Sequence, residues 1–334
     1  MTSPTAAPVP NLPASPGSLL LRSARPTLGP RSFGLGPILA LAGLLLHAGP
    51  LVAGPQPTSR ALAFERDGAV WVSSADGTGA LKLVEGVDPR ISPDGLRIAY
   101  TRDSSAARGV RRHIAIVDIA SRTSRELTSV PGDNSFGPVW SPDGSTLLAY
   151  VLADKQWNLG LVNADNTGFR FVVRPGPGVP PCWSAAWAPD GVSIFCQDLE
   201  SLFRLSLDGK QLWRASVAQL FPKADLNSGA RVTSSPDGRR LLVEVDVDEA
   251  TTAGNWDGPP PAVFLVDVEA KSSKRLTAPG LLAWHPEWLD VTDFLCVVER
   301  QGDKEPSVAR MPLAGGTPIM LLSNARNPSL STAP

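Results

Sequence analysis

The sequence has few of the residues from which metal centres and reactive sites are usually built. Its 334 residues include three Cys and three His. Three thiols, at Cys182, Cys196 and Cys296, are too few for a four-thiolate zinc site or a disulfide framework. The G-x-S-x-G motif of serine hydrolases is also missing from the sequence. We therefore expect no metal site, no cofactor and no catalytic residue, and a chain that is not an enzyme.

An excess of charge of one sign is missing too. Lys and Arg number 31 and Asp and Glu number 32, which gives a formal net charge of −1. A dedicated nucleic-acid binder carries a clear basic excess, so neither DNA nor RNA is an expected partner. Apolar residues make up 43% of the chain and charged residues 19%, and this balance predicts a folded protein with a sizeable core.

The N-terminal 54 residues resemble an export signal. Residues 1–30 contain Arg22 and Arg25 but no acid, and an apolar stretch follows at residues 33–54. His47 interrupts this stretch too early for a comfortable membrane span. We expect cleavage near Ala53 or Gly54, with an uncleaved anchor at residues 33–54 as the alternative. Either outcome predicts an extracytoplasmic protein, periplasmic or secreted.

A turn tetrapeptide repeats along the rest of the chain. Copies begin at Ser92, Ser141, Ala188 and Ser235, and each ends in Pro-Asp-Gly. A degenerate fifth copy is His285-Pro286-Glu287-Trp288, and the steps between copies are 49, 47, 47 and 50 residues. Pro, Asp and Gly each favour a tight turn, so every copy predicts a hairpin between two short apolar strands. The spacing is typical of a propeller blade.

Strand counting predicts an all-β fold, a six-bladed β-propeller of four-stranded antiparallel blades. The segment from Ala61 to Glu85 supplies three strands of a first blade, whereas residues 327–331 resemble an innermost strand with nothing after it. If the C-terminal strand completes the first blade, the ring closes without an open edge. We therefore expect a linker at residues 55–60 and one propeller domain at residues 61–334, as a monomer.

The repeated W-S-P-D-G signature and outer strands such as residues 124–128 resemble the TolB family of propellers. The resemblance covers the chain from Ala61 onward. It implies the six-bladed fold and a role in the cell envelope. A TolB protein also carries an α/β domain before its propeller, whereas here residues 55–60 alone separate the signal from the first expected strand.

The expected loops are longer on one face, which carries the links between blades and the loops between second and third strands. Binding usually lies in long loops on a rigid scaffold, and these loops contain aromatic residues, an Arg cluster and an acidic cluster. An alternative interpretation is that the aromatic rings fill gaps between blades and that the charges are merely solvated. The candidate binding residues are Arg102, Arg108, Arg111, Arg112, Phe136, Trp157, Trp183, Phe221, Asp246, Asp248 and Trp256.

These features predict a non-catalytic envelope or secreted propeller. It would bind a protein or a partner linked to the cell wall through the long-loop face and the mouth of the central channel. The alternative is a carbohydrate-active lyase or glycosidase that uses acids and Arg at the channel mouth. A calcium site near residues 244–248 is a weaker alternative, because the spacing lacks the Gly of an EF-hand loop. His113 and His285 are interpreted as structural, with His285 at the turn position that Ser holds elsewhere.

The two thiols around the third repeat leave a choice open. Cys182 and Cys196 flank the turn that begins at Ala188, and a register offset by one residue would direct them to opposite faces. We expect buried free thiols here, with a disulfide as the alternative. Cys296, in the matching strand of a later blade, is expected to be a buried thiol.

Overall fold

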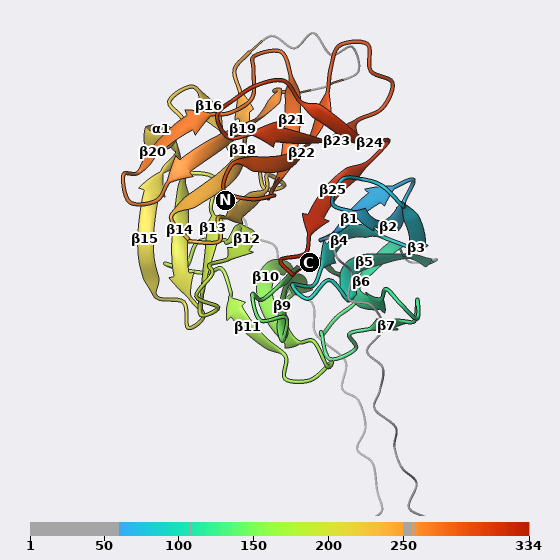
Figure 1. Ribbon diagram of the computed structural model, residues 1–334. Coiled ribbons are helices and arrows are strands. Elements are labelled where there is room, and N and C mark those ends of the chain that lie inside the picture. The colour runs from blue at the N-terminus through green and yellow to red at the C-terminus, as the bar shows by residue number, and fades with distance from the viewer. Residues whose placement is uncertain (1–59, 107–108, 250–255, 257, 334) are drawn as a thin grey trace, which may run out of the picture. The chain divides into compact units, whose positions relative to one another are not determined.

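The computed structural model describes residues 60–106, 109–249, 256 and 258–333. In this part of the chain six antiparallel sheets are arranged as the blades of a ring (Figure 1). Each blade has four strands, and one blade gains a short fifth strand. The predicted six-bladed β-propeller is confirmed.

The first three blades contain these strands, ordered from the channel outward. Blade 1 has β25 (Arg326–Leu330), β1 (Ala61–Arg66), β2 (Ala69–Ser74) and β3 (Leu81–Glu85); blade 2 has β4 (Val87–Ile91), β5 (Arg97–Ala106), β6 (Gly109–Asp118) and β7 (Ser124–Glu126); blade 3 has β8 (Ser135–Trp140), β9 (Thr146–Ala153), β10 (Gln156–Asn163) and β11 (Arg170–Val173).

The last three blades follow the same order. Blade 4 has β12 (Trp183–Trp187), β13 (Ser193–Gln197), β14 (Ser201–Ser206) and β15 (Gln211–Ser216); blade 5 has β17 (Val232–Ser234), β18 (Arg240–Val247), β19 (Pro261–Asp267) and β20 (Ser272–Arg275); blade 6 has β21 (Leu282–Trp288), β22 (Asp293–Glu299), β23 (Ser307–Pro312) and β24 (Ile319–Ser323). Strand β16 (Ala224–Asp225) adds to β18, and the short helix α1 (Val217–Leu220) follows β15.

The C-terminal strand completes blade 1. Strand β25 pairs antiparallel with β1, so the first and last described parts of the propeller share one sheet. The seam continues past the strands, because the Ser331 amide donates to the Ala61 carbonyl at 2.9 Å and the Ala61 amide donates to Ser331 Oγ at 2.9 Å. The ring closes as the sequence predicted.

The four Pro-Asp-Gly copies form the predicted hairpin turns. In each, the Gly amide donates to the carbonyl of the first residue of the copy, at 2.9 to 3.1 Å. All four glycines, at positions 95, 144, 191 and 238, have φ near +70°, where a side chain would be strained. The fifth copy, at residues 285–288, was wrongly predicted to be a turn. His285 lies inside the inner strand β21. The turn of blade 6 comes later, at Leu289, whose amide donates to the Asp293 carbonyl at 3.2 Å.

Inner strands carry a bulge where they line the channel, and this bulge positions the site. The strand register shifts by one residue in blades 1, 2, 3, 4 and 6. A residue with positive φ lies at each of these bulges: Asn327, Asp88, Gly137, Ser184 and His285, in that order of blades. A bulge bends its strand and leaves a backbone amide without a ladder partner.

Side chains on second strands take up these amides and join neighbouring blades. At four seams a polar group of one blade accepts a bulge amide of the next: Glu65 from Asp88 at 3.2 Å, Thr101 from Gly137 at 3.2 Å, Tyr150 from Ala185 at 2.8 Å and Glu244 from His285 at 2.9 Å. The matching residue in blade 6 is Val297, which has no polar group to offer. These contacts fix one inner strand relative to the next.

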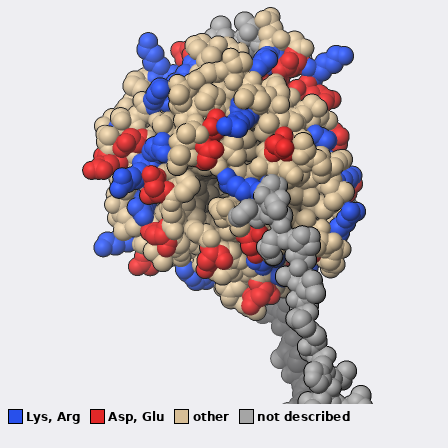
Figure 2. All heavy atoms as spheres, viewed as in Figure 1, with Lys and Arg blue, Asp and Glu red and all other residues tan. Residues whose placement is uncertain are grey.

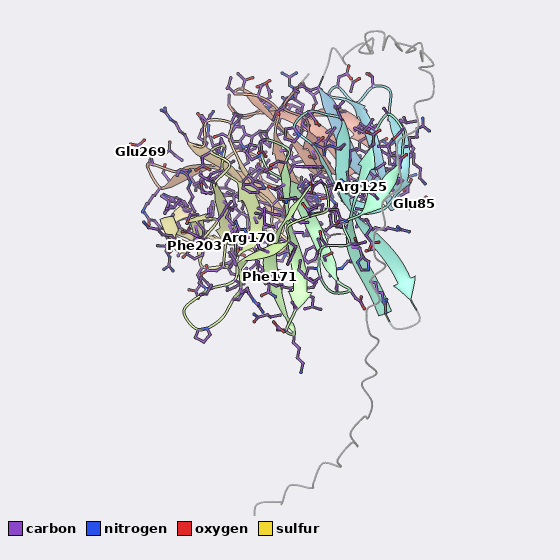
Figure 3. All side chains as sticks on the ribbon, turned by 90° about the horizontal axis from the view of Figure 1, so that it is seen from below. Glu85, Arg125, Arg170, Phe171, Phe203 and Glu269 are labelled. Carbon is purple, nitrogen blue, oxygen red and sulfur yellow. A yellow bond between two sulfur atoms is a disulfide. The ribbon has the colours of Figure 1, made fainter. Side chains whose placement is uncertain are left out.

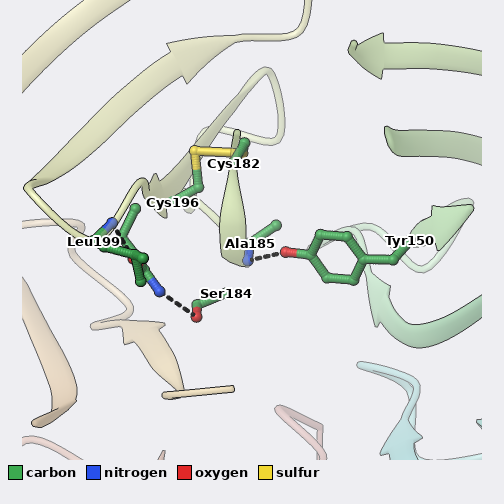
Figure 4. The surroundings of a disulfide bond; sticks show 7 residues. Tyr150, Cys182, Ser184, Ala185, Cys196 and Leu199 are labelled. Atoms are coloured by element: carbon green, nitrogen blue, oxygen red, sulfur yellow. Dashed lines mark hydrogen bonds between the residues drawn. A yellow bond between two sulfur atoms is a disulfide. The ribbon is translucent and has the colours of Figure 1, made fainter. Parts of the chain in front are cut away.

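Blade 4 contains a disulfide where free thiols were expected. Cys182 and Cys196 are bonded, with their Cα atoms 5.3 Å apart (Figure 4). The prediction of free thiols was wrong because the bulge between Trp183 and Ala186 shifts the register by one residue. That shift brings Cys182 to the same face of the sheet as Cys196. Cys296 is a buried free thiol, as expected, and burial raises its pKa.

Two expected loops are partly regular structure. Residues 102–112 were expected to be a loop, but strands β5 and β6 continue through most of this segment and form a long hairpin. In the view of Figure 3 this hairpin projects from one side of the ring. Helix α1 and strand β16 lie within the expected loop at residues 215–229.

The export signal, the alternative anchor and most of the linker lie outside the described residues. Within the described residues no helix has the length and apolar character of a membrane span.

Candidate binding site at the channel mouth

A pocket with a volume of about 540 Å³ opens where blades 5, 6 and 1 meet. It lies on the long-loop face, because the link before β17 and the loop after β22 both contribute to it. We call it the mouth pocket, and it is lined by Asn227, Gly229, Glu244, Trp256, Trp284, His285, Glu299, Lys304, Pro306 and Arg326. In the view of Figure 2, acidic and basic side chains are interspersed over the surface around a central hollow.

Glu244 is the buried acid of the mouth pocket. It lies on β18 and is 6% exposed, and its Oε2 accepts the amides of His285 at 2.9 Å and Arg231 at 3.3 Å. Burial raises the pKa of Glu244 to about 7, although these two amides and the nearby Arg231 act in the opposite direction. At neutral pH this carboxyl therefore exchanges between its charged and neutral forms.

His285 lies beside Glu244 at the bulge of β21, with φ of 50°. Burial lowers the pKa of His285 well below its usual value, and the charge of Arg231 lowers it further, so the ring is neutral at pH 7. Its Nδ1 atom is buried and has no hydrogen-bond partner among the described residues. A buried polar atom without a partner costs free energy, and such atoms are rare in folded proteins.

Four charged side chains line the mouth pocket, two acidic and two basic. Lys304 and Arg326 are exposed, Glu299 is half-buried and Glu244 is buried. Among the described residues, no salt bridge within 4.0 Å involves any of the four. Glu244 has the charge of Arg231 nearby, whereas Lys304, Arg326 and Glu299 present charges of both signs without an ion-pair partner among the described residues.

Two Trp rings form the apolar wall of the pocket. The ring centroids of Trp256 and Trp284 lie 5.5 Å apart at an interplanar angle of 42°. Trp284 is 8% exposed, whereas Trp256 is half-buried, with its Nε1 bonded to the Pro259 carbonyl at 2.9 Å. This bond orients the indole and leaves its faces for packing.

A buried Arg supports the pocket from the channel. Arg231, in blade 5, donates to the Pro328 carbonyl at 2.8 Å and to Asn327 Oδ1 at 2.9 Å, both in blade 1. Burial lowers the pKa of Arg231 to about 9, with a further contribution from Arg90, so the side chain stays charged at neutral pH. Burial raises the pKa of Glu287, which lies in the same group of channel residues.

Two of the eleven candidate residues lie at or beside the mouth pocket, and a third follows two residues after the second of them. Trp256 lines it. Asp246 is bonded to Asn227 Nδ2 at 3.0 Å, and burial together with the charge of Asp225 raises the pKa of Asp246. Asp248 is exposed at the end of β18, and its amide donates to the Lys223 carbonyl at 3.4 Å.

Other candidates form a separate group on blades 2 to 4. The Arg112 guanidinium lies 4.5 Å from the Phe136 ring and 5.4 Å from the Trp157 ring, and its Nε donates to Asn134 Oδ1 at 2.8 Å. Trp183 packs against Tyr150 at 5.9 Å between ring centroids. These aromatic rings are half-buried and bridge blades, which matches the alternative interpretation that they fill gaps.

The remaining candidates differ in exposure. Arg102 and Arg111 are exposed on the β5–β6 hairpin, and Arg111 pairs with Asp133 at 3.5 Å. Phe221 is 2% exposed and packs against Phe264, so its ring belongs to the core. Arg108 lies outside the described residues.

Four residues of the pocket were not among the candidates from the sequence: Trp284, Glu299, Lys304 and Arg326. Trp284 and His285 lie in the segment that was interpreted as a degenerate fifth turn copy, and its departure from Ser-Pro-Asp-Gly was the available signal. Within the described residues no group of three or more His, Cys, Asp or Glu is arranged to hold a metal ion.

No protein-family profile matches this sequence, and no curated protein matches it. Solved structures do match. TolB from Acinetobacter baumannii has a TM-score of 0.59 at 16% identity, over 83% of this chain and 67% of that chain. A putative TolB from Agrobacterium tumefaciens has a TM-score of 0.56 at 14% identity, over 79% and 89%.

Enzymes share the same architecture. A puromycin hydrolase S511A mutant, complexed with PGG, has a TM-score of 0.54 at 16% identity, over 80% of this chain and 44% of that chain. Identities this low establish the fold and leave the activity open. The chain therefore has the TolB-like six-bladed propeller fold.

Proposed function

We propose that this chain is a non-catalytic, extracytoplasmic β-propeller that binds a protein or cell-wall-linked partner at the channel mouth on its long-loop face. The observation that carries this proposal is the mouth pocket, where Lys304, Arg326 and Glu299 have no ion-pair partner among the described residues and two Trp rings form an aromatic wall. Such a surface offers hydrogen bonds and charge complementarity, while the Trp pair offers apolar area.

The scaffold around the pocket is suited to rigid docking. His285 and Arg326 belong to the inner strands β21 and β25. Glu244 on β18 holds the bulge of β21, and Arg231 joins blade 5 to β25. A preorganised surface loses little conformational entropy when a partner docks. We expect the partner to meet this face without rearranging it.

The role of the buried acid also favours binding over catalysis. Glu244 Oε2 already accepts two backbone amides and holds the bulge of β21 in place. A carboxyl in that position supports the pocket floor. In a lyase or glycosidase, Glu244 or Glu299 would instead have to reach the sugar, and substitution of the acid would abolish release of reducing ends.

Site-specific photocrosslinking in the intact envelope tests the proposal. A photoreactive residue replaces Lys304 at the pocket or, as the matched control, Asp208, which is exposed at the turn between β14 and β15 on the opposite face. We expect a discrete crosslinked species from position 304 only. Equal crosslinking from both positions, or none from position 304, would contradict the proposal. Release of reducing ends from a polysaccharide by the wild type would favour the enzyme.

A further inference from the structure

The uncompensated charges of the mouth pocket indicate the chemistry of a small ligand. A ligand with one charge would satisfy either the basic pair, Lys304 and Arg326, or the acidic pair, Glu244 and Glu299. It would leave the groups of the other sign, either Glu299 or Lys304 and Arg326, without a counter-charge. A ligand that carries both charges satisfies the whole set.

We propose that the mouth pocket binds a zwitterionic amino-acid group, in which one carbon carries both an ammonium and a carboxylate. The carboxylate lies between the basic side chains Lys304 and Arg326, which the solvent can reach. The ammonium lies toward Glu299 and Glu244. The inference goes beyond the proposed function, because it holds whether or not a protein docks on the same face.

Two further observations support the ammonium end. The Trp256 and Trp284 rings line the same pocket as the two acids and offer a π face to a cation. Burial holds the pKa of Glu244 near 7, so an adjacent ammonium favours the charged carboxylate.

The size of the pocket fits this class of ligand. A volume of about 540 Å³ is in the range of ordinary small-molecule sites and exceeds what an amino acid fills. The group can therefore belong to a free amino acid or to a diamino acid carried by a peptide, as in a cell-wall crosslink. Both sources present the same ammonium and carboxylate on one carbon.

Calorimetric titration of the purified chain at pH 7 tests the inference with matched probes. Leucine in both enantiomers carries both charges, N-acetyl-leucine keeps only the carboxylate, and leucinamide keeps only the ammonium. A short peptide that bears diaminopimelate presents the peptide-borne form. We expect a zwitterionic probe to bind at least about tenfold tighter than both single-charge probes, which corresponds to about 1.4 kcal/mol. Binding of the peptide alone supports the inference and assigns its source.

Two substitutions assign the ends of the ligand. Arg326→Gln should remove the preference for leucine over leucinamide, and Glu299→Gln should remove the preference for leucine over N-acetyl-leucine. Neither side chain makes a hydrogen bond or salt bridge in the described structure, so both variants should keep the wild-type melting temperature. Lys210→Gln is the charge-matched control, because Lys210 is exposed at the β14–β15 turn.

Three results would overturn the inference. They are measurable binding of leucine that a single-charge probe equals, unchanged preferences in both substituted variants, and no saturable binding of any zwitterionic probe, the peptide included. The proposed function is tested separately. If crosslinking from position 304 persists while every zwitterion fails to bind, the inference is wrong and the protein-binding proposal stands.

Discussion

Arg231 in blade 5 is joined to Asn327 in blade 1, past the whole of blade 6, by a hydrogen bond of 2.9 Å from Nη2 to Oδ1. The same guanidinium donates to the Pro328 carbonyl at 2.8 Å. The seam between blades 6 and 1 is the place where the second strand offers Val297 and no polar acceptor. Arg231 therefore links the strand that closes the ring to a blade two positions away.

Replacing Arg231 by Met should destabilise the propeller by about 3 to 5 kcal/mol, because Glu244 and Glu287 lose a buried positive charge. Urea unfolding measures the change. Arg239→Met is the control, since Arg239 is exposed and should change stability by no more than about 0.5 kcal/mol. Equal stability of the two variants would show that the link across blade 6 contributes nothing.

Deleting residues 327–334 should open the ring. The deletion removes most of β25 and leaves β1 with an unpaired edge, so the melting temperature should fall far more than for removal of an ordinary tail. Thermal unfolding followed by circular dichroism measures the change. Deleting only residues 333 and 334 is the control. If both deletions leave the melting temperature of the full chain unchanged, the closure through β25 is wrong.

Replacing Gly238 by Val should cost about 1 to 3 kcal/mol, since its φ is 69° and a β-branched residue is strained there. An added Cβ would also lie 3.2 Å from Pro189 Cδ in the neighbouring turn. Gly176 is the matched control, because it lacks a positive φ and an added Cβ meets nothing within 4 Å. Chemical denaturation of both variants gives the comparison, and equal losses would contradict the turn geometry.

The unfolded, non-reduced protein should contain one titratable thiol, Cys296, because Cys182 and Cys196 form a disulfide. Thiol titration in denaturant gives the number directly. Reduction should destabilise the folded chain by about 3 kcal/mol, the value expected for a closed loop of about 15 residues. Finding three thiols before reduction would support the expectation drawn from the sequence against the structure.

The stability of the chain should depend on Glu244 near neutral pH. Its pKa is about 7 in the folded protein and is lower when the side chain is exposed, so the folded state holds the proton more tightly. The stabilisation is complete below the unfolded pKa and is lost as the pH rises through about 7. Melting temperatures from pH 5 to 8 should therefore fall less for Glu244→Gln than for the wild type. Parallel curves would mean that Glu244 keeps an ordinary pKa.

The sequence predicts the blades well because turn chemistry is local. The four Pro-Asp-Gly copies depend on neighbouring residues only, and the surplus strand at residues 327–331 shows how the ring closes. The bulges were not predictable in this way. They change the register by one residue, and that single shift brings Cys182 to Cys196 and places His285 at the channel.

The mouth pocket was predicted only in its general position. Trp256 was a candidate, but Lys304, Glu299 and Arg326 come from segments with no repeat or motif to mark them. Their proximity depends on how blades 5, 6 and 1 meet, which is a long-range property. Arg112 and Phe136 carried a stronger signal in sequence, yet they pack mainly with each other and with Trp157.

Amide hydrogen exchange on the chain, with and without the partner captured from position 304, tests the central claim most directly. We expect slower exchange in the segments that line the mouth pocket, residues 226–231, 299–306 and 324–327, and unchanged exchange in the turns at residues 92–97 and 141–146. Protection confined to the turns, or to the Arg112 and Phe136 group, would contradict binding at the channel mouth.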